Sequence, residues 1–351
     1  MTSTAMAIRP KKPWVKTPQQ RIPTILTFLL SIALASAIVG FTPMKGKLAF
    51  AIVFVPVVTV LEYMVVRVRN GARAAADIVA SAVMSAAAFL VFLPVVSILG
   101  TTLKRGLPGL RANLFTESMA VASFTDPLSK GGLLHAIVGT LYLILLSVAI
   151  SVPLGILTAL YLTEIRGPGS NFIQFIVQAM SGIPSVIAGL FIYSSIILAT
   201  PLQPSALLGG FALSILMIPT VTRTSQEVLL LIPNELREAG LALGATQWKT
   251  VAMVVVPAAR SGLITAVILG VARIAGETAP LLFVLGGADA LNLNPFSGYN
   301  SALPFYVWKG FLIGLPEATQ RAWTAILILL ILVLILFTLA RAVGPKKREQ
   351  R

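Results

Sequence analysis

The chain of 351 residues is 57% hydrophobic and 11% charged, with a mean hydropathy of +0.91. So few charges cannot cover that much apolar surface in water, which excludes a soluble protein of this size and predicts a polytopic membrane protein. Cysteine is absent, so disulfides and thiolate metal sites are excluded. The net charge is +15, and the basic residues lie at the ends of apolar runs. Basic residues in such positions indicate the orientation of a membrane protein, so the charge is not taken as evidence of nucleic-acid binding.

Eight apolar runs are long enough to cross a bilayer, because a hydrocarbon core of roughly 30 Å needs about 20 helical residues. Backbone polar groups in lipid must be satisfied within the segment, so these runs are expected to be helices. The predicted fold class is all-α and polytopic. The spans are 22–41, 48–66, 78–99, 134–162, 172–198, 205–221 (extending toward Leu231), 262–286 and 322–343.

The distribution of Lys and Arg predicts the orientation of the chain. With the N-terminus in the cytoplasm, the inside segments carry more than twice as many Lys and Arg residues as the outside segments. Both termini are therefore expected to be cytoplasmic, as basic tails at 1–21 and 344–351. The small residues at 35–37 imitate a signal-peptidase site, but the apolar run is long for a signal peptide, so we expect the first span to stay uncleaved.

The chain is expected to divide into an appended part and a main part. Residues 22–70 form a transmembrane hairpin extension, whose role the sequence does not disclose. Residues 71–133 supply the first span of the core and a long external loop rich in Gly, Pro and Ser. Residues 134–343 form the main helical domain, in which stripes of small residues predict close helix packing, and five prolines within the spans of the chain predict kinks. The stripes are Ser147, Ser151, Gly155, Ala159; Ser181, Ser185, Gly189; and Gly262, Ala266, Gly270; the prolines are Pro94, Pro153, Pro184, Pro219 and Pro280.

Residues 232–257 predict a helical hairpin in the cytoplasm. Pro233 suits the first turn of a helix, Gly244 suits a left-handed residue at its end, and Thr246 can cap the next helix. Pro257 is expected to break the second helix before the chain re-enters the membrane. A narrow face of small residues with acidic flanks favours docking into a groove of another protein. A membrane-surface helix would instead carry Lys and Arg on its polar face.

This hairpin resembles the EAA loop of ABC-importer permeases. Its spacing matches throughout, with Gly240, Val254 and Val256 as small or aliphatic departures from the pattern. In that family the loop is the coupling helix that seats in the cytoplasmic ATPase, so the resemblance implies no catalytic residue and no cofactor in this chain, since ATP and Mg are bound by the partner ATPase. The residues implied in the coupling are Glu238, Ala239, Gly240, Gly244 and Pro257.

Two charged residues fall inside the seventh predicted span. Arg273 and Glu277 are four residues apart, so on a helix they share a face and are expected to pair. Arg223 follows Pro219 within a run rich in hydroxyl groups. Because intramembrane charges are costly and an arginine fork suits an oxyanion, we predict a path for an anion. The alternative is a structural ion pair, with Arg223 at the cytoplasmic interface.

Residues 271–280 and 218–224 resemble segments of phosphate-importer permeases, as do 136–141 and 182–186. The resemblance is to the PstA type, covers about 75–343, and implies an ABC transmembrane type-1 permease core in a prokaryotic plasma (inner) membrane. Its implied partners are a homologous PstC-type permease, a PstB-type ATPase dimer, an extracytoplasmic PstS-type phosphate-binding protein and membrane lipid. The implied substrate path comprises Arg223, Arg273, Glu277 and Thr278, and no metal site is expected.

The function predicted from the sequence is that of a permease subunit, forming half of the path of an ATP-driven phosphate importer. Glu277 is expected to accept a hydrogen bond from the proton that phosphate retains at neutral pH, or to neutralise Arg273 when the path is empty. One alternative within the class is the PstC-type partner or a permease for another oxyanion. An alternative from another class is a secondary transporter or channel that works without an ATPase.

Overall fold

The structure is a computed structural model that describes residues 18–43 and 46–342. Within that part of the chain every regular element is a helix, and the one β-bridge joins Gly286 and Asn300. Seven of these helices are long and apolar enough to cross a membrane, and a bent helix pair adds an eighth. The prediction of an all-α polytopic protein is confirmed. The chain divides after Ile98 into two compact units, and each is described by itself.

The first unit contains α1 (Pro18–Phe41), α2 (Lys47–Asn70) and most of α3 (Ala72–Gly106). Helices α1 and α2 pack together, with the ring of Phe28 edge-on to that of Phe54 at 5.4 Å between centroids. Gly71, with a φ of +89°, separates α2 from α3. Helix α3 is longer than the predicted span 78–99, because its alanine-rich first turns favour helix and no glycine interrupts them.

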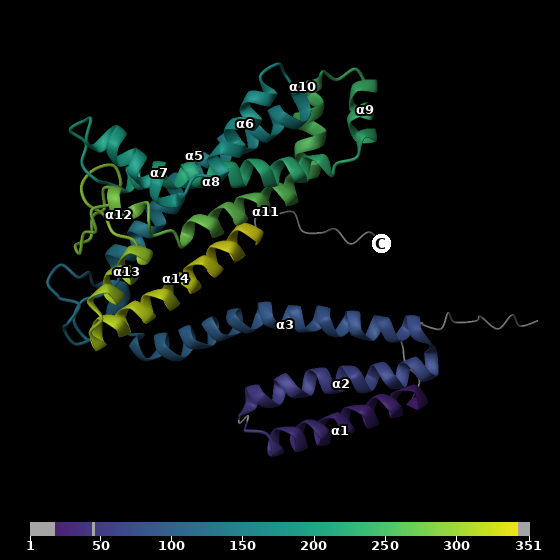
Figure 1. Ribbon diagram of the computed structural model, residues 1–351. Helices are drawn as coiled ribbons and strands as arrows, with labels where there is room; N and C mark the ends of the chain where they lie inside the picture. Colours follow the sequence, from purple (N-terminus) through teal and green to yellow (C-terminus); the bar gives the residue numbers. More distant parts are fainter. Residues whose placement is uncertain (1–17, 44–45, 343–351) are drawn as a thin grey trace, which may run out of the picture. The chain divides into compact units, whose positions relative to one another are not determined.

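The second unit is a bundle in which α8 (Ala206–Leu230) is the central helix, with 67% of its span buried. It packs against α5 (Leu134–Leu160) and α11 (Val256–Ala275), and α14 (Pro316–Ala342) contacts α11 (Figure 1). The stripes on α5 and α11 face α8, as close helix packing requires. The hydroxyl of Ser147 donates to the carbonyl of Gly210 at 3.2 Å, and added Cβ atoms at Gly155 and Gly270 would lie 2.9 and 2.8 Å from Val221.

The predicted fifth span, 172–198, is not a single helix. It consists of α6 (Ser170–Ser181) and α7 (Ser185–Ile192), the latter extended by a π-helical turn, η3 (Tyr193–Ile197), and the two parts are bent by 104°. Pro184 is extended, with a ψ of 136°, and it has no N–H to continue the helix. The second stripe is therefore divided: Ser181 lies before the bend, and Gly189 packs against the backbone of Pro280.

The seventh helical run is displaced from its predicted bounds of 262–286. It begins at α10 (Gln247–Thr250), passes through a π-helical turn, η4 (Val251–Val255), and ends with α11 at Ala275. Pro257 does not break the run, because it lies in the first turn of α11 after the π-helical turn. The run ends before Gly276, since Pro280 has no N–H for the carbonyl four residues earlier. A short helix, α12 (Leu281–Val284), follows.

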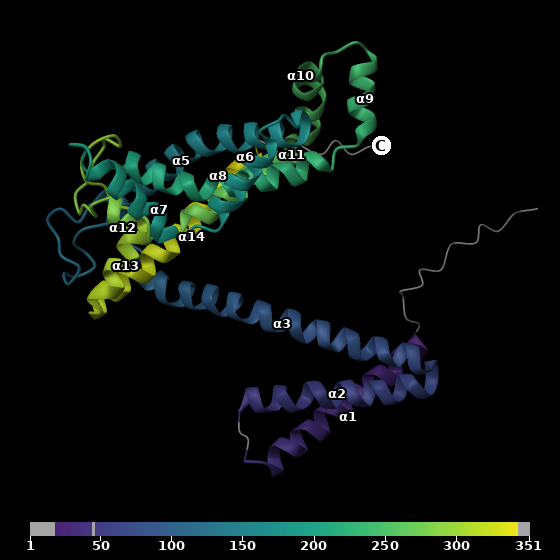
Figure 2. The ribbon, with the colours of Figure 1, turned by 45° about the horizontal axis from the view of Figure 1, so that its top comes forward.

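One end of the second unit, here called the loop end, is formed by η1 (Leu107–Gly109), α4 (Asn113–Thr116), α12 and α13 (Leu303–Ile313) (Figures 1 and 2). Helix α13 was not predicted, and α14 begins at Pro316 instead of residue 322. Arg321 is 1% exposed, and its Nη2 donates to the carbonyls of Asp126, Pro127 and Lys130 at 3.1, 2.9 and 2.8 Å. The predicted external loop is therefore held against the bundle.

Candidate functional site

The predicted hairpin is present at the other end of the second unit, here called the hairpin end (Figures 1 and 2). Its first arm is α9 (Asn234–Ala242) and its second begins with α10. Gly244 has a φ of +79°, and the amides of Gly244 and Ala245 donate to the carbonyls of Leu241 and Gly240, so α9 ends in a Schellman motif. The hydroxyl of Thr246 accepts from the amide of Lys249, as a helix cap does. The predicted turn and cap are confirmed.

The residues matched to the EAA loop point in different directions. Glu238, Ala239 and Gly244 are exposed, so they are accessible to a partner. Gly240 is buried, and an added Cβ there would lie 2.7 Å from Cγ2 of Thr250. Its small size therefore brings the two arms of the hairpin together. Pro257 is exposed on α11 and lies outside the hairpin turn.

The hairpin end also carries exposed apolar side chains that sequence reasoning missed. Leu231, Leu243, Trp248 and Met253 are 80%, 90%, 64% and 74% exposed. Their signal in the sequence is weak: Leu243 and Trp248 each stand between small or polar residues, whereas Leu231 and Met253 lie in apolar runs that do not show which side chains stay exposed. Together with the exposed Glu238, they give this end an apolar and acidic surface, a composition suited to a protein partner.

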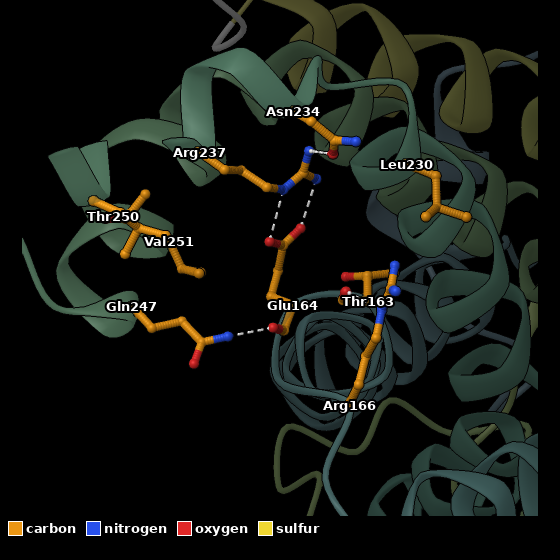
Figure 3. A pocket seen from close by; sticks show the side chains of 10 residues that line it. Thr163, Glu164, Arg166, Leu230, Asn234, Arg237, Gln247, Thr250 and Val251 are labelled. Atoms are coloured by element: carbon orange, nitrogen blue, oxygen red, sulfur yellow. Dashed lines mark hydrogen bonds and ion pairs between the residues drawn. The ribbon is translucent and has the colours of Figure 1, made fainter. Parts of the chain in front are cut away.

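Arg237 makes the strongest polar contact of the hairpin, and the sequence did not indicate it. Its Nε and Nη2 donate to Oε2 and Oε1 of Glu164 at 2.9 and 2.8 Å (Figure 3). Glu164 lies in the π-helical turn η2 (Tyr161–Ile165) that ends α5. The hydrogen bond to Glu164 raises the pKa of Arg237, so the guanidinium stays charged. A pocket of about 310 Å³ lies beside this pair, between the end of α5 and the two arms of the hairpin.

The predicted intramembrane residues are brought together only in part. Arg273 lies in the last turn of α11, and its Nη1 donates to Oγ1 of Thr220 on α8 at 3.1 Å. Arg223 follows Thr220 on α8 by three residues, close to one turn, and it is exposed. Arg273 is thus bonded to Thr220 across two packed helices, and Arg223 lies about one turn further along α8. The hydroxyl-rich run indicated this neighbourhood, although not the partner of Arg273.

The predicted ion pair between Arg273 and Glu277 is wrong. Spacing of four residues pairs side chains only while the helix continues, and α11 ends at Ala275. Among the described residues the ion pairs are Arg237–Glu164 and Lys309–Asp289. Glu277 is half-buried and lines a small pocket of about 10 Å³ with Thr140 and Leu281, and Thr278 begins the turn into α12. Within the described chain, its carboxylate has no hydrogen bond or ion pair.

Comparison with known proteins finds relatives of this chain. The family model described as "Binding-protein-dependent transport system inner membrane component" matches residues 151–349. The chain is 39% identical over 204 residues to phosphate transport system permease protein PstA 1 of Mycobacterium tuberculosis (strain CDC 1551 / Oshkosh), covering 58% of this chain and 67% of the relative. It is 39% identical over 251 residues to the PstA permease of Haemophilus influenzae (strain ATCC 51907 / DSM 11121 / KW20 / Rd), covering 69% and 84%.

Among solved structures, an inward-facing form of the MetNI methionine ABC transporter is similar, with a TM-score of 0.46 and 23% identity, covering 59% of this chain and 90% of the other. The family model extends over more than half of the chain, and the curated relatives are named as permeases. The chain therefore belongs to the family of binding-protein-dependent transport system inner membrane components, as a multi-pass membrane transport protein and not an enzyme.

Proposed function

We propose that this chain is the PstA-type permease subunit of an ATP-driven phosphate importer and forms half of its translocation path. The observation that carries the proposal is the placement of Arg223 and Arg273 around Thr220, in a chain whose relatives are named as phosphate permeases. Two guanidinium groups and a hydroxyl group together offer many hydrogen-bond donors. Among the described residues, no carboxylate is paired with Arg273 and would compete with an anion. A tetrahedral oxyanion is the class of substrate that uses such donors.

The hydrogen bonds of these residues leave capacity for a substrate. A guanidinium has five N–H donors, and Arg273 directs one of them to Thr220. Arg223 has no partner among the described residues. A charged group without a partner gains more from a bound anion than one already paired, because less has to be broken before binding. This supports Arg223 and Arg273 as substrate-path residues.

Glu277 and Thr278 are proposed to discriminate among anions. The Glu277 carboxylate accepts hydrogen bonds but cannot donate them while it is ionised. Hydrogen phosphate carries a proton that it can offer to this carboxylate, whereas sulfate has none and would be repelled. Because Glu277 does not neutralise Arg273, its part in the proposal is limited to contact with the substrate. Glu277→Gln should then reduce the preference for phosphate over sulfate in competition for uptake.

The hairpin is proposed to dock the cytoplasmic ATPase dimer of the PstB type, with both chain termini in the cytoplasm of a prokaryote. The exposed Glu238, Leu243 and Trp248 would be covered in that complex. A homologous PstC-type permease would supply the other half of the path, and a PstS-type binding protein would deliver phosphate at the loop end. ATP and Mg would be bound by the ATPase.

Uptake by the assembled complex tests this function. The chain would be expressed with its candidate partners in cells that lack their own high-affinity phosphate uptake, and labelled phosphate would be followed with and without excess sulfate. ATP-dependent uptake that sulfate does not inhibit is the expected result. Uptake of sulfate instead would assign another oxyanion. Uptake that continues without the ATPase would indicate a secondary transporter or a channel.

Docking is tested separately by Glu238→Lys. Reversing this exposed charge should abolish co-purification of the ATPase while the permease remains in the membrane. Glu317→Lys is the matched control, because Glu317 is exposed at the start of α14, at the loop end. Recovery of an intact, fully active complex from the Glu238→Lys variant would contradict the assignment of the hairpin.

A further inference from the structure

We infer that the Arg237–Glu164 pair is the joint through which movement of the hairpin is passed to α5 and α8. The inference rests on the proposed function, since it concerns how an ATPase docked on the hairpin would drive the bundle. Arg237 and Glu164 are positioning residues in this account, because neither reaches the Arg223–Arg273 region. Three observations support it: the complete use of Arg237, the burial of the pair, and a second attachment from the other arm.

All five N–H donors of Arg237 are in use. Two of them hold the carboxylate of Glu164 at the end of α5. The remaining ones reach the carbonyls of Leu229 and Ile232, at 2.9 and 2.6 Å, and Oδ1 of Asn234 at 3.3 Å. Leu229 and Ile232 lie where α8 ends, and a helix end leaves carbonyls that need such donors. A single guanidinium on α9 therefore ties together α5, α8 and the hairpin.

The pair is shielded from water. The side chains of Arg237 and Glu164 are 20% and 5% exposed. Removing one member would leave the other, largely buried charge without its counter-charge, which is more unfavourable than losing an exposed ion pair. A displacement of α9 by a partner is therefore transmitted to α5 and α8 more readily than it is absorbed by breaking this contact.

The second arm of the hairpin is fixed to the same residue. Nε2 of Gln247, in α10, donates to the backbone carbonyl of Glu164 at 2.5 Å (Figure 3). Behind it, a buried apolar cluster joins Ala159 and Leu160 of α5 to Leu229 of α8 and to Val251 and Val255 of η4. Both arms thus meet at the last turn of α5, so the hairpin is mounted as one body and not on a flexible linker.

The π-helical turn explains how Glu164 reaches the hairpin. Residues 161–165 form wider turns than an α-helix, and the next residue, Arg166, adopts a left-handed conformation with a φ of +50°. A non-glycine residue in that region is unusual and persists only where surrounding contacts determine it. The local departure from α-helix coincides with the attachment of Glu164 to Arg237 and Gln247, as π-helical turns often do at functional positions.

The decisive variants are Arg237→Gln and Glu164→Gln, assayed as the complete permease–ATPase complex in proteoliposomes. We expect the complex to be recovered and ATP to be hydrolysed, with uptake per ATP hydrolysed falling about tenfold, because an unpaired charge weakens the attachment. The exchange Glu164→Arg with Arg237→Glu should restore part of the loss. Arg166→Gln, an exposed arginine lining the same pocket, is the matched control.

A structural role alone predicts a different result. In that case uptake and hydrolysis would fall by the same factor as the yield of complex, and the ratio between them would not change. This outcome, or an unchanged ratio at full yield, would overturn the inference. If the wild-type complex took up no phosphate, the proposed function would be wrong. The joint could still be tested by measuring the distance between α5 and the hairpin.

That independent test uses spin labels, which the absence of native cysteines allows. Labels on Leu157→Cys of α5 and Leu236→Cys of α9 would replace two exposed leucines outside the proposed docking residues, which are 60% and 41% exposed. Their separation should stay constant in the wild-type complex when ATP binds, because the two sites move as one body. It should vary with nucleotide after Arg237→Gln. A separation that varies in the wild type, or stays fixed in the variant, would contradict the joint.

Discussion

The charged groups at the hairpin end and those along the bundle differ in how completely they are paired. Arg237 uses all of its donors on Glu164 and on the chain ends around it. Arg273 makes one hydrogen bond, to a neutral hydroxyl group, and Glu277 makes none within the described chain. A saturated charge fixes the elements around it, whereas an unsaturated charge is available to a ligand.

This difference separates residues that hold the protein together from residues that act on the substrate. Arg321 resembles Arg237 in holding elements together, because it is buried and its Nη2 is bound to three carbonyl groups of the 107–133 region, although its Nε has no partner among the described residues. Arg223 belongs with Arg273, because it is exposed beside the same threonine. Variants of the first pair should change stability or coupling, and variants of the second should change uptake with the protein intact.

The largest effect on stability is expected from Arg321→Met. Removing the buried guanidinium leaves three partly buried carbonyl groups without their donor, which should lower the free energy of unfolding by roughly 3 kcal/mol. Thermal unfolding of the purified protein, together with protease cleavage of the 107–133 region, measures this. Arg111→Met, at an exposed arginine of the same region, is the control. Equal stability of the two variants would show that Arg321 does not hold the 107–133 region in place.

Gly189→Ala tests the contact that positions Glu277. The added methyl group would meet the backbone of Pro280, which cannot move without shifting the turn that carries Glu277 and Thr278. Overpacking of this kind destabilises by about 1–3 kcal/mol, and we expect a matching loss of uptake. Gly100→Ala is the control, because nothing lies within 4 Å of that position. Uptake as high as in the control would show that this turn is not part of the path.

Thr220→Val should produce a smaller change. It removes the hydroxyl group that accepts from Arg273 and nearly preserves the side-chain volume. Loss of one such hydrogen bond is worth about 1 kcal/mol, so the apparent affinity for phosphate should fall roughly fivefold. Thr265→Val, on the exposed face of α11, serves as the control because its hydroxyl bonds only to its own helix. An unchanged affinity would mean that the hydrogen bond from Arg273 to Thr220 of α8 does not contribute to phosphate binding.

The smallest effect is expected from Thr246→Ala in the hairpin. The capping bond to Lys249 is long, at 3.4 Å, so its loss should cost about 0.5 kcal/mol, at the lower end for helix caps. Co-purification of the ATPase should weaken by roughly twofold. Thr246→Ser keeps the hydroxyl and should bind normally. A complete loss of binding would show that Thr246 contacts the ATPase directly.

Much of the helical architecture was predictable because it depends on local patterns. Long apolar runs located the spans, and the small stripes on α5 and α11 correctly indicated faces that pack closely on α8. The consequences of proline were harder to read. Pro257 lies in a first helical turn and breaks nothing, whereas Pro184 and Pro280 end helices. A proline interrupts a helix only where its missing N–H and its ring conflict with the carbonyl group four residues earlier, and the π-helical turn before Pro257 could not be read from a sequence pattern.

The sequence indicated which segments form the sites, but not which side chains contact each other there. The hydroxyl-rich run and Arg273 were identified. The predicted pairing of Arg273 with Glu277 assumed that the helix continues through Glu277, whereas α11 ends two residues earlier, at Ala275. The Arg237–Glu164 contact joins residues 73 positions apart, and no local spacing indicates such a pair. Its discovery required the fold, because long-range polar contacts depend on how helices are placed in space.

The most direct test of the account is labelled phosphate uptake by cells that express this chain with its candidate partners, as wild type and as Arg273→Gln. The variant removes the charge and most of the donors, so uptake should fall by about tenfold to a hundredfold while assembly and the Arg237–Glu164 joint remain intact. Arg69→Gln, at an exposed arginine of α2, is the control. Uptake that persists in an assembled Arg273→Gln complex would contradict the assignment of the unsaturated charges to the phosphate path.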